Sequence, residues 1–580
     1  MPLAAPPDRL VRQDLPPSKA VLVKLRNLTT LGGLLSLGDL AQVSGVFFGF
    51  GCLFLLFRSQ NYLAVDGAVR CLGVYHRPNV FFHGNNHLLY PLNILTWYRF
   101  LTVLGLQPKS PVEFISLMQV MNCLAGAGCL AILYFLMHVV TSSWRPALIL
   151  TMGYGLSRAF LLHATNSAEP MLAILWSLLA LLLAASSFTI KSIWPIVLSG
   201  VLFSLAMATY QSTILLAPAA IVLILQSRSQ ERPRASLPSA RCFGLGIFAA
   251  GGFISSACIY GVAYWHSGAR GFSTTLKRLF TVEGGRVYGG TSISKLINTP
   301  VGLVGNIFPV LPPHYAGIRS LWNKGQGFWL AWIVLVVVFF CGLLLVYMIQ
   351  VFKKWSGLRR SVRIAMSSAG IGFVMTLIPV MFWDPTYDKL WLQPLACLSF
   401  LVVLSLDVIL DLRVSFFFSR IVPMLLLAGV VSNLSWAVES HFRETPYLKE
   451  AQQLARILGK GDLVVSDYDG VSVLYSSIWA DDGQVFSFPT EATAHGIGAA
   501  SRLREAIVRT QRRGGRVYFL GVLDQTQQTW DAFLWRRCGV PYSEMDLYRV
   551  HSSVRAEFKH VGSAVRLREL DQPTSTSASQ

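Results

Sequence analysis

Four acidic residues beside long apolar segments are the side chains of this chain best suited to chemistry. Asp66 follows the first long apolar run within a few residues, Glu169 stands in "NSAEPML", and Asp384 and Asp388 stand in "FWDPTYDKLW". An acid in or at the edge of a membrane span is costly and is therefore a candidate functional residue. A carboxylate in such a place can act as a general base toward a hydroxyl group. The alternative for each acid is simple solvation at the membrane interface.

A polar stretch, "HGNNHLLYPL", follows Asp66. Its side chains offer hydrogen-bond donors and acceptors that suit a polar ligand, and that equally suit fixing the loop: His83, Asn85, Asn86, His87 and Tyr90. His83 and His87 are four residues apart, but the intervening "GNN" indicates a turn rather than a helix. The pattern therefore favours hydrogen bonding over metal ligation.

Cations occur near the same acids. Lys389 directly follows Asp388, and the stretch "GARGFSTTLKRLFTVEGGRVYGG" of the segment 266–327 carries four basic residues: Arg270, Lys277, Arg278 and Arg286. Arg and Lys both bind phosphate groups, so these side chains are candidates for an anion site. The alternative is a solvated loop whose cations touch lipid headgroups.

The composition is that of a membrane protein. Of 580 residues, 53% are hydrophobic and 13% are charged, whereas soluble proteins have about 25% charged residues. The net charge of +20 does not indicate nucleic-acid binding, because many basic residues stand between apolar runs, where membrane topology explains them. The sequence contains no P-loop, no G-x-G-x-x-G after a strand, no H-E-x-x-H and no G-x-S-x-G. These absences leave a nucleotide-driven pump or a common hydrolase unsupported.

Eleven apolar runs approach or exceed the roughly 20 residues that a spanning helix needs. They are residues 43–57, 113–140, 145–163, 170–188, 192–208, 211–226, 242–265, 328–351, 363–382, 389–411 and 419–437. We therefore expect a polytopic helical membrane domain over 43–437.

Basic loops orient these spans. The segment 1–42 carries five basic residues between positions 9 and 26, which places it in the cytoplasm, and the two most basic short loops then also fall inside. The opposite, outer side receives the loops 58–112 and 266–327, the turn 383–389 and everything after about 438. All four acids reach this face, where they could converge on one pocket. No outer segment contains an N-x-S/T site, which favours a bacterial inner membrane over a secretory-pathway membrane.

Two further parts have their own patterns. "YPLNILTWYRFLTVLG" places polar residues in a three-residue stripe, which predicts a helix lying in the membrane interface. Residues 438–570 read as a soluble α/β domain on the outer face, with helices in "YLKEAQQLARILGKG" and "ASRLREAIVRTQRRGG" and strands in "DLVVS" and "RVYFLGV". The tail 571–580 is low in apolar residues and is expected to be disordered.

An acid in the first outer loop, an interfacial helix, about a dozen spans and a soluble outer domain together resemble the GT-C superfamily of polyprenyl-phosphate-sugar glycosyltransferases. Within it, the chain looks most like protein O-mannosyltransferases and lipid A aminoarabinose transferases. The resemblance implies transfer of a sugar from a polyprenyl-phosphate donor to a hydroxyl of a lipid, glycan or protein, in one inverting displacement.

The resemblance also implies roles for single residues. Asp66 matches the superfamily's first-loop acid, so it is the candidate base or acceptor-positioning group. Glu169 matches a second acid, which could orient the acceptor or help to bind a divalent metal. The departing phosphate needs cations, and we expect Lys389, Arg278 and Arg286 to supply them. The loop has a single Asp66 where the superfamily has a D-E or D-x-D pair, so metal dependence stays open.

Two other functions compete with this one. A transporter or lipid flippase would also contain isolated charges, but it predicts acids at mid-membrane and an inverted internal repeat. A non-catalytic anchor for the C-terminal domain would leave the shared side of the acids unexplained.

Overall fold

The computed structural model describes most of the apolar segments and the core of the C-terminal part. The described residues are 37–59, 65–76, 87–141, 143–187, 192–227, 237–266, 292–308, 318–323, 325–410, 422–442, 446–459, 461–466, 484–487, 498–527, 530, 539–560 and 563–571.

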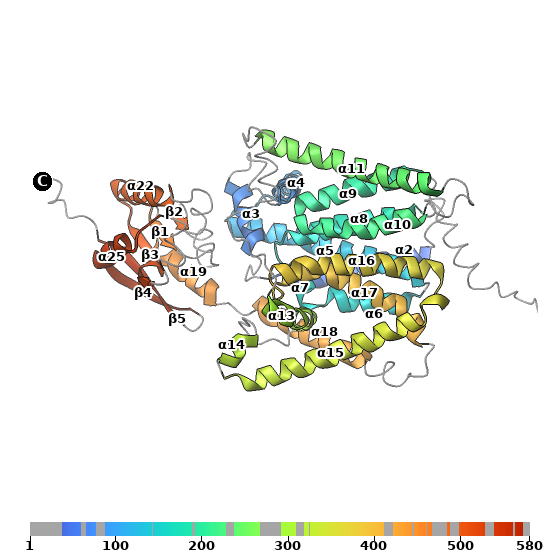
Figure 1. Ribbon diagram of the computed structural model, residues 1–580. Helices are drawn as coiled ribbons and strands as arrows, with labels where there is room; N and C mark the ends of the chain where they lie inside the picture. The colour runs from blue at the N-terminus through green and yellow to red at the C-terminus, as the bar shows by residue number, and fades with distance from the viewer. Residues whose placement is uncertain are drawn as a thin grey trace, which may run out of the picture.

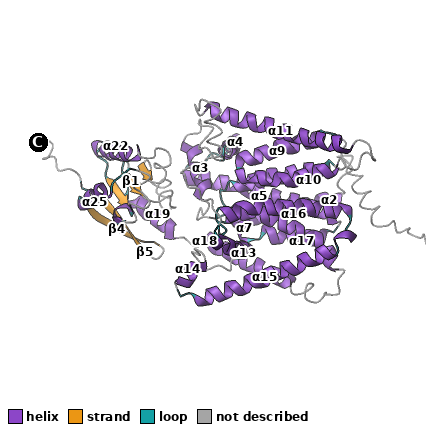
Figure 2. Cartoon of the chain, in the orientation of Figure 1, coloured by secondary structure: helices purple, strands orange, loops and turns teal. Residues whose placement is uncertain are grey.

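A helix, or two consecutive helices, lies at each of the eleven apolar runs. They are α2 (Leu37–Leu56), α5 (Pro111–Thr141), α6 (Trp144–Gly155) with α7 (Arg158–Ala164), α8 (Pro170–Ser186), α9 (Trp194–Thr209), η2 (Gln211–Leu216) with α10 (Ala217–Ser227), α11 (Leu237–His266), α15 (Gly327–Lys353), α16 (Arg360–Phe382), α17 (Asp388–Leu410) and α18 (Val422–Phe442). Figure 1 shows these helices side by side in one bundle, and Figure 2 shows that the strands are confined to the C-terminal part.

The number of full spans is smaller than expected within the described residues. Six helices are long and apolar enough to cross a membrane, and the bent pair α6 and α7 would make a seventh. The helices α8 and α9 are apolar but have only 17 and 16 residues, and η2 with α10 is similarly short. A polytopic helical membrane domain is thus supported by six or seven candidate spans, whereas the expected eleven full spans stay a prediction.

The run 145–163 is not one straight helix. A bend of 70° separates α6 from α7, and the side chain of Ser157 caps the second helix by accepting a hydrogen bond from the backbone N–H of Phe160. Ser and Thr are preferred at such caps because their oxygen satisfies an N–H that has no partner within the helix. The bend turns α7 out of line with α6 at the end of the bundle.

The helix predicted to lie in the membrane interface is present as α4 (Leu89–Val103), and its place in the interface stays a prediction. Figure 1 shows it nearly end-on while the bundle helices run across the view, so it lies crosswise to them. The indole N–H of Trp97 donates to the carbonyl of Leu117 in α5 at 2.9 Å. Next to it, α3 (Val65–His76) packs on both α4 and α5.

The segment 266–327, expected to be a loop, contains two helices, α13 (Ile293–Ile307) and α14 (Ile318–Asn323). Ser292 caps α13 by accepting from the N–H of Lys295. The sequence pattern does not predict α13, because this helix contains Pro300 and two glycines, which are poor helix formers. Gly302 has a packing reason, since a Cβ there would overlap the carbonyl of Pro385.

The C-terminal part contains a five-stranded mixed sheet of order β2-β1-β3-β5-β4. Its strands are β1 (Leu463–Ser466), β2 (Gln484–Ser487), β3 (Val517–Leu520), β4 (Ser552–His560) and β5 (Ser563–Leu570), and its helices are α19 (Pro446–Ile457), α22 (Ala499–Arg512), η7 (Val522–Asp524) and α25 (Tyr542–Val550). β1 pairs in parallel with both β2 and β3, and β5 runs antiparallel to β3. The partly parallel sheet is confirmed, and β4 and β5 are additions to the strands expected from sequence.

Helices cover both faces of this sheet. On one face, Val465 and Phe519 share an apolar cluster with Leu503 of α22 and Met545 of α25. On the other face, Val464 of β1 and Tyr518 of β3 cluster with Leu454 of α19. Because β1 and β3 are buried on both faces, they read as unbroken apolar runs in the sequence.

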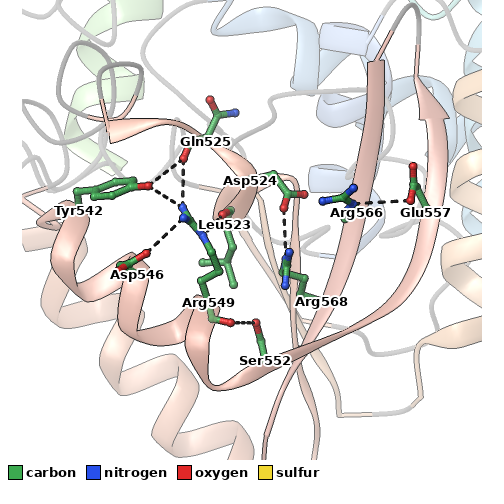
Figure 3. Close-up of polar contacts among 10 residues, drawn as sticks. All are labelled: Leu523, Asp524, Gln525, Tyr542, Asp546, Arg549, Ser552, Glu557, Arg566 and Arg568. Atoms are coloured by element: carbon green, nitrogen blue, oxygen red, sulfur yellow. Dashed lines mark hydrogen bonds and ion pairs between the residues drawn. The ribbon is translucent and has the colours of Figure 1, made fainter.

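A polar network fixes the loop that follows β3 (Figure 3). The Arg549 guanidinium donates to the backbone carbonyl of Leu523 at 2.6 Å and to that of Gln525 at 3.2 Å. It also donates to the hydroxyl of Tyr542 at 2.9 Å and pairs with Asp546 at 3.3 Å. Arg549 therefore ties α25 to the end of the sheet.

Candidate functional site

Segments far apart in the sequence are tied together at one end of the bundle. The backbone N–H of Ser59, just after α2, donates to the carbonyl of Thr165 at 3.1 Å, and the Gln119 side chain donates to the carbonyl of Ser59 at 2.8 Å. The ammonium of Lys295 in α13 donates to the carbonyl of Phe382 at 2.6 Å. This is the end where α3 and α4 lie and beyond which the sheet lies (Figure 1).

Asp66 lies in the first turn of α3. The next residue, Gly67, is buried against the backbone of the loop between α7 and α8. A Cβ at position 67 would overlap the carbonyl group of Ser167 and lie 3.1 Å from the backbone nitrogen of Ala168. Only glycine allows this approach, which places the turn that carries Asp66 against the residues just before Glu169.

Glu169 is the N-cap residue of α8 and is 2% exposed. The positive end of the helix dipole favours a carboxylate at this position. The buried side chain of Asn122 in α5 holds the preceding loop, because its amide donates to the carbonyls of Asn166 at 2.7 Å and Ala168 at 2.8 Å. Glu169 is therefore held in place from α5 as well as from α3.

The negative charge of Glu169 affects the pKa values of two neighbouring side chains. Burial, and then the negative charge of Glu169, raise the pKa of the Cys71 thiol in α3 well above its ordinary value. Burial raises the pKa of the Tyr90 hydroxyl in α4, with Cys71 and Glu169 adding to the effect. Cys71, Tyr90 and Glu169 are all buried, so the charge of Glu169 acts on the other two side chains with little screening by solvent.

Asp388 makes a different kind of contact at the start of α17. Its carboxylate lies 3.1 Å from Nε2 of His163 in α7 and accepts the backbone N–H of Lys389 at 2.8 Å. Arg158, at the start of α7, contributes a positive charge near Asp388. The Arg158 guanidinium also donates to the carbonyl of Gly305 in α13 at 3.3 Å and lies 5.6 Å from the Trp436 ring of α18. Asp388 is thus part of a buried network that joins four helices.

Asp384 has no comparable position. Its side chain is exposed and accepts both the backbone N–H and the hydroxyl of Thr386, at 2.8 and 2.7 Å. This is the hydrogen bonding of a polar turn, in which an Asp side chain fixes the chain two residues on. Asp384 is therefore a turn residue, unlike the buried Glu169 and the partly buried Asp388.

Lys389 and His87 both contact the ring of Tyr210, which follows α9. The ammonium of Lys389 lies 5.9 Å from the Tyr210 ring centroid and 4.8 Å from that of Tyr387. The imidazole of His87 stacks on Tyr210, with centroids 5.2 Å apart and planes inclined by 12°. The structure thus brings together two predicted substrate-binding residues from loops that are 300 residues apart in the sequence.

Several predicted site residues lie outside the described residues. They are His83, Asn86, Arg278 and Arg286, together with Asn85, Arg270 and Lys277. Their roles stay predictions.

The sequence did not single out Asn122, His163, Arg158 or Tyr210. Asn122 and His163 lie within apolar runs, and a buried polar residue in such a run is a recognisable signal because it needs a hydrogen-bond partner. Its partner, however, is not visible in the sequence. Within the described parts of the chain, no three His, Cys, Asp or Glu side chains are grouped to hold a metal ion.

Comparison with known proteins gives a likeness only among solved structures. No family model matches the sequence, and neither does any curated protein. The crystal structure of ArnT from Cupriavidus metallidurans bound to undecaprenyl phosphate aligns with 12% identity and a TM-score of 0.46, covering 92% of this chain and 98% of that one. The apo state of the same protein aligns with the same identity and TM-score over 90% and 97% of the two chains. Both alignments therefore extend over most of the two chains, at low sequence identity.

Proposed function

We propose that this protein is an integral-membrane glycosyltransferase that moves a sugar from a polyprenyl-phosphate donor to a hydroxyl acceptor on the outer face of the membrane. One observation carries the proposal. The backbone contact of Gly67 with Ser167 seats the turn of Asp66 beside the loop that ends in the buried Glu169. This contact supports the assignment of both acids to one acceptor site at the end of the bundle.

The chemistry follows from these positions. Asp66 takes the proton of the acceptor hydroxyl as its oxygen attacks the anomeric carbon of the donor sugar. The bond from that carbon to the phosphate oxygen breaks in the same displacement, and the polyprenyl phosphate leaves with the bonding electrons. Glu169 orients the acceptor, and the ammonium of Lys389 stabilises the negative charge that grows on the phosphate.

The remaining acids are assigned by their contacts. Asp388 acts through the helix that carries Lys389, since it binds both His163 and the backbone N–H of Lys389. Asp384 is assigned no role in binding substrate, because its carboxylate is used by Thr386. The sugar, the acceptor and the length of the lipid stay open in this proposal.

The test is sugar transfer in membranes that contain the protein. Wild type, Asp66→Asn and Glu113→Gln would be given undecaprenyl-phosphate sugars, with lipid products analysed by mass spectrometry. We expect Asp66→Asn to lower the rate by about 10²- to 10⁴-fold, the usual contribution of a general base. Glu113 is the matched control, because it is an exposed acid at the start of α5 whose carboxylate accepts the backbone N–H of Lys109.

Full transfer by a correctly inserted Asp66→Asn protein would remove the central assignment. Movement of intact donor across the membrane without cleavage would instead identify a transporter or flippase. If the wild-type protein showed neither sugar transfer nor donor movement, that result would favour the anchor function.

The orientation needs a separate test, because Glu169 is too buried to label. In a cysteine-free background, Asp384→Cys and Glu113→Cys should react with an impermeant maleimide from outside, and Ser356→Cys should not. All three positions are exposed, so the reverse pattern would invert the assigned faces.

A further inference from the structure

Tyr210 occupies a junction that no pattern in the sequence marks. It follows Thr209 at the end of α9, where the backbone becomes extended before η2 begins. Its side chain is 5% exposed. The ring nevertheless contacts two basic side chains from other parts of the chain, His87 and Lys389.

His87 is held in a defined orientation against this ring. Its Nδ1 lies 3.2 Å from the carbonyl oxygen of Thr209, and a carbonyl can only accept, so Nδ1 carries the hydrogen. The backbone of His87 has φ of 63°, in the left-handed region. Non-glycine residues are held there only when surrounding contacts fix them, and such strain often marks a functional site.

Lys389 reaches the same ring from the start of α17. Its ammonium lies within cation–π range of the Tyr210 and Tyr387 rings. Its backbone is fixed by the carboxylate of Asp388, which is itself held by His163. The backbone and the ammonium of Lys389 are therefore both positioned.

We propose that Tyr210 is a positioning residue whose ring orients both the Lys389 ammonium and the His87 imidazole, and that these two side chains contribute to one subsite for the phosphate of the lipid-linked donor. The inference rests on the proposed function and deepens it. An aromatic face orients a cation without cancelling its charge. A carboxylate in the place of Tyr210 would neutralise the ammonium and weaken its attraction for phosphate.

The chemistry of the subsite suits a phosphate on a lipid. Lys supplies a compact charge that binds phosphate oxygens. Because Nδ1 of His87 carries the hydrogen that faces the Thr209 carbonyl, the other ring nitrogen, Nε2, donates to a phosphate oxygen when the imidazole is protonated.

The experiment compares Tyr210→Leu with Tyr210→Phe. Two quantities would be measured in detergent-solubilised full-length protein: binding of undecaprenyl phosphate, and KM and kcat for the undecaprenyl-phosphate sugar. Leucine removes both ring contacts, so we expect binding to weaken and KM to rise about three- to tenfold with kcat nearly unchanged. Phenylalanine keeps the ring face and should behave like wild type.

Tyr134 provides the matched control. It is 2% exposed and stacks on His138, with ring centroids 5.8 Å apart and planes inclined by 2°. This pair lies at the far ends of α5 and α2, where His138 contacts Asp39. Tyr134→Leu removes a similar buried ring from a similar histidine, yet it should leave KM and lipid binding unchanged.

Each result separates this inference from the proposed function. Unchanged KM and binding in Tyr210→Leu, with sugar transfer intact, would overturn the role of Tyr210 alone. Tyr210-dependent binding of undecaprenyl phosphate without any transfer would support the subsite and overturn the transferase. No binding and no transfer by the wild type would overturn both.

Loss of folding in Tyr210→Leu would be recognised by its melting temperature. Lys389→Met and Lys389→Arg then take its place, because they change the cation and leave the ring. Lys389→Met should raise KM at least as much as Tyr210→Leu. Lys389→Arg keeps the positive charge and should retain most of the lipid binding. Equal KM values for Lys389→Met and Lys389→Arg would reject the subsite.

Discussion

Replacement of Gly67 by alanine tests the contact on which the site depends. A Cβ at position 67 would overlap the Ser167 carbonyl and also approach the Ala168 backbone nitrogen at 3.1 Å. Both atoms belong to the backbone, so no flexible side chain can move aside. Because carbon and its neighbours need about 3.5 Å of separation, α3 or the loop would have to retreat by about 2 Å.

The expected cost has two parts. Overpacking of a close contact destabilises a protein by about 1–3 kcal/mol, and a rigid backbone neighbour puts Gly67→Ala at the upper end. A shift of about 1 Å in a catalytic group can cost about 100-fold in rate, so sugar transfer should fall by at least that factor. The loss arises because Asp66 moves with α3 away from Glu169.

The assay measures the melting temperature in detergent and the rate of sugar transfer, with Gly49→Ala as the control. Gly49 is a helical glycine of α2, and no neighbouring atom lies within 4 Å of the place that a Cβ would occupy there. Alanine at this position should be neutral or stabilising by about 1 kcal/mol, since alanine favours helices over glycine. A Gly67→Ala protein with the melting temperature and rate of the wild type would refute the packing of α3 on the loop.

Three further perturbations have defined outcomes. Asn122→Ala removes the two hydrogen bonds that the Asn122 amide donates to the carbonyls of Asn166 and Ala168 and should lower the free energy of unfolding by about 2–4 kcal/mol. Asn306→Ala should cost less, because among the described residues the Asn306 side chain bonds only Gly302 of its own helix. Equal losses of stability, measured by denaturation in detergent, would contradict this. Asp388→Asn weakens the contact with His163. Since the Asp388 side chain is 23% exposed, we expect the free energy of unfolding to fall by about 1–3 kcal/mol. Full additivity with His163→Gln in a double-mutant cycle would argue against coupling between the two side chains. Burial and the neighbouring Glu544 raise the pKa of Tyr548 from 10.0 to about 12, so its stabilising contribution is complete below pH 10 and is lost as the pH rises through 12. Glu544→Gln should lower that pKa in an ultraviolet titration, and an unchanged value would remove Glu544 as a cause.

The helical architecture was largely predictable because apolar length is a local property of the sequence. Each apolar run became a helix, and the polar stripe of 90–105 became α4. The misjudged parts were those where tertiary packing overrode local preference. The helix α13 forms despite Pro300, and α6 and α7 are separated by a bend that Ser157 caps.

The candidate site was predictable only in part. The assignment of loops to the two sides of the membrane put Asp66, Glu169, Asp388 and Lys389 on the same face. In the structure, the segments that carry these residues lie at one end of the bundle. The same reasoning grouped Asp384 with them, although its carboxylate serves a turn. Charge and position along a span do not reveal which partner a carboxylate will find.

The sequence by itself determined that this is a multi-pass helical membrane protein, because the number and length of its apolar runs indicate membrane spans, while the orientation inferred from its basic loops stays a prediction. Tertiary structure alone decided which groups meet. Gly67 touches Ser167 across 100 residues of sequence, and Tyr210 joins His87 to Lys389. Such contacts depend on distances between helices, which are fixed by packing across the whole bundle and leave no local mark in the chain.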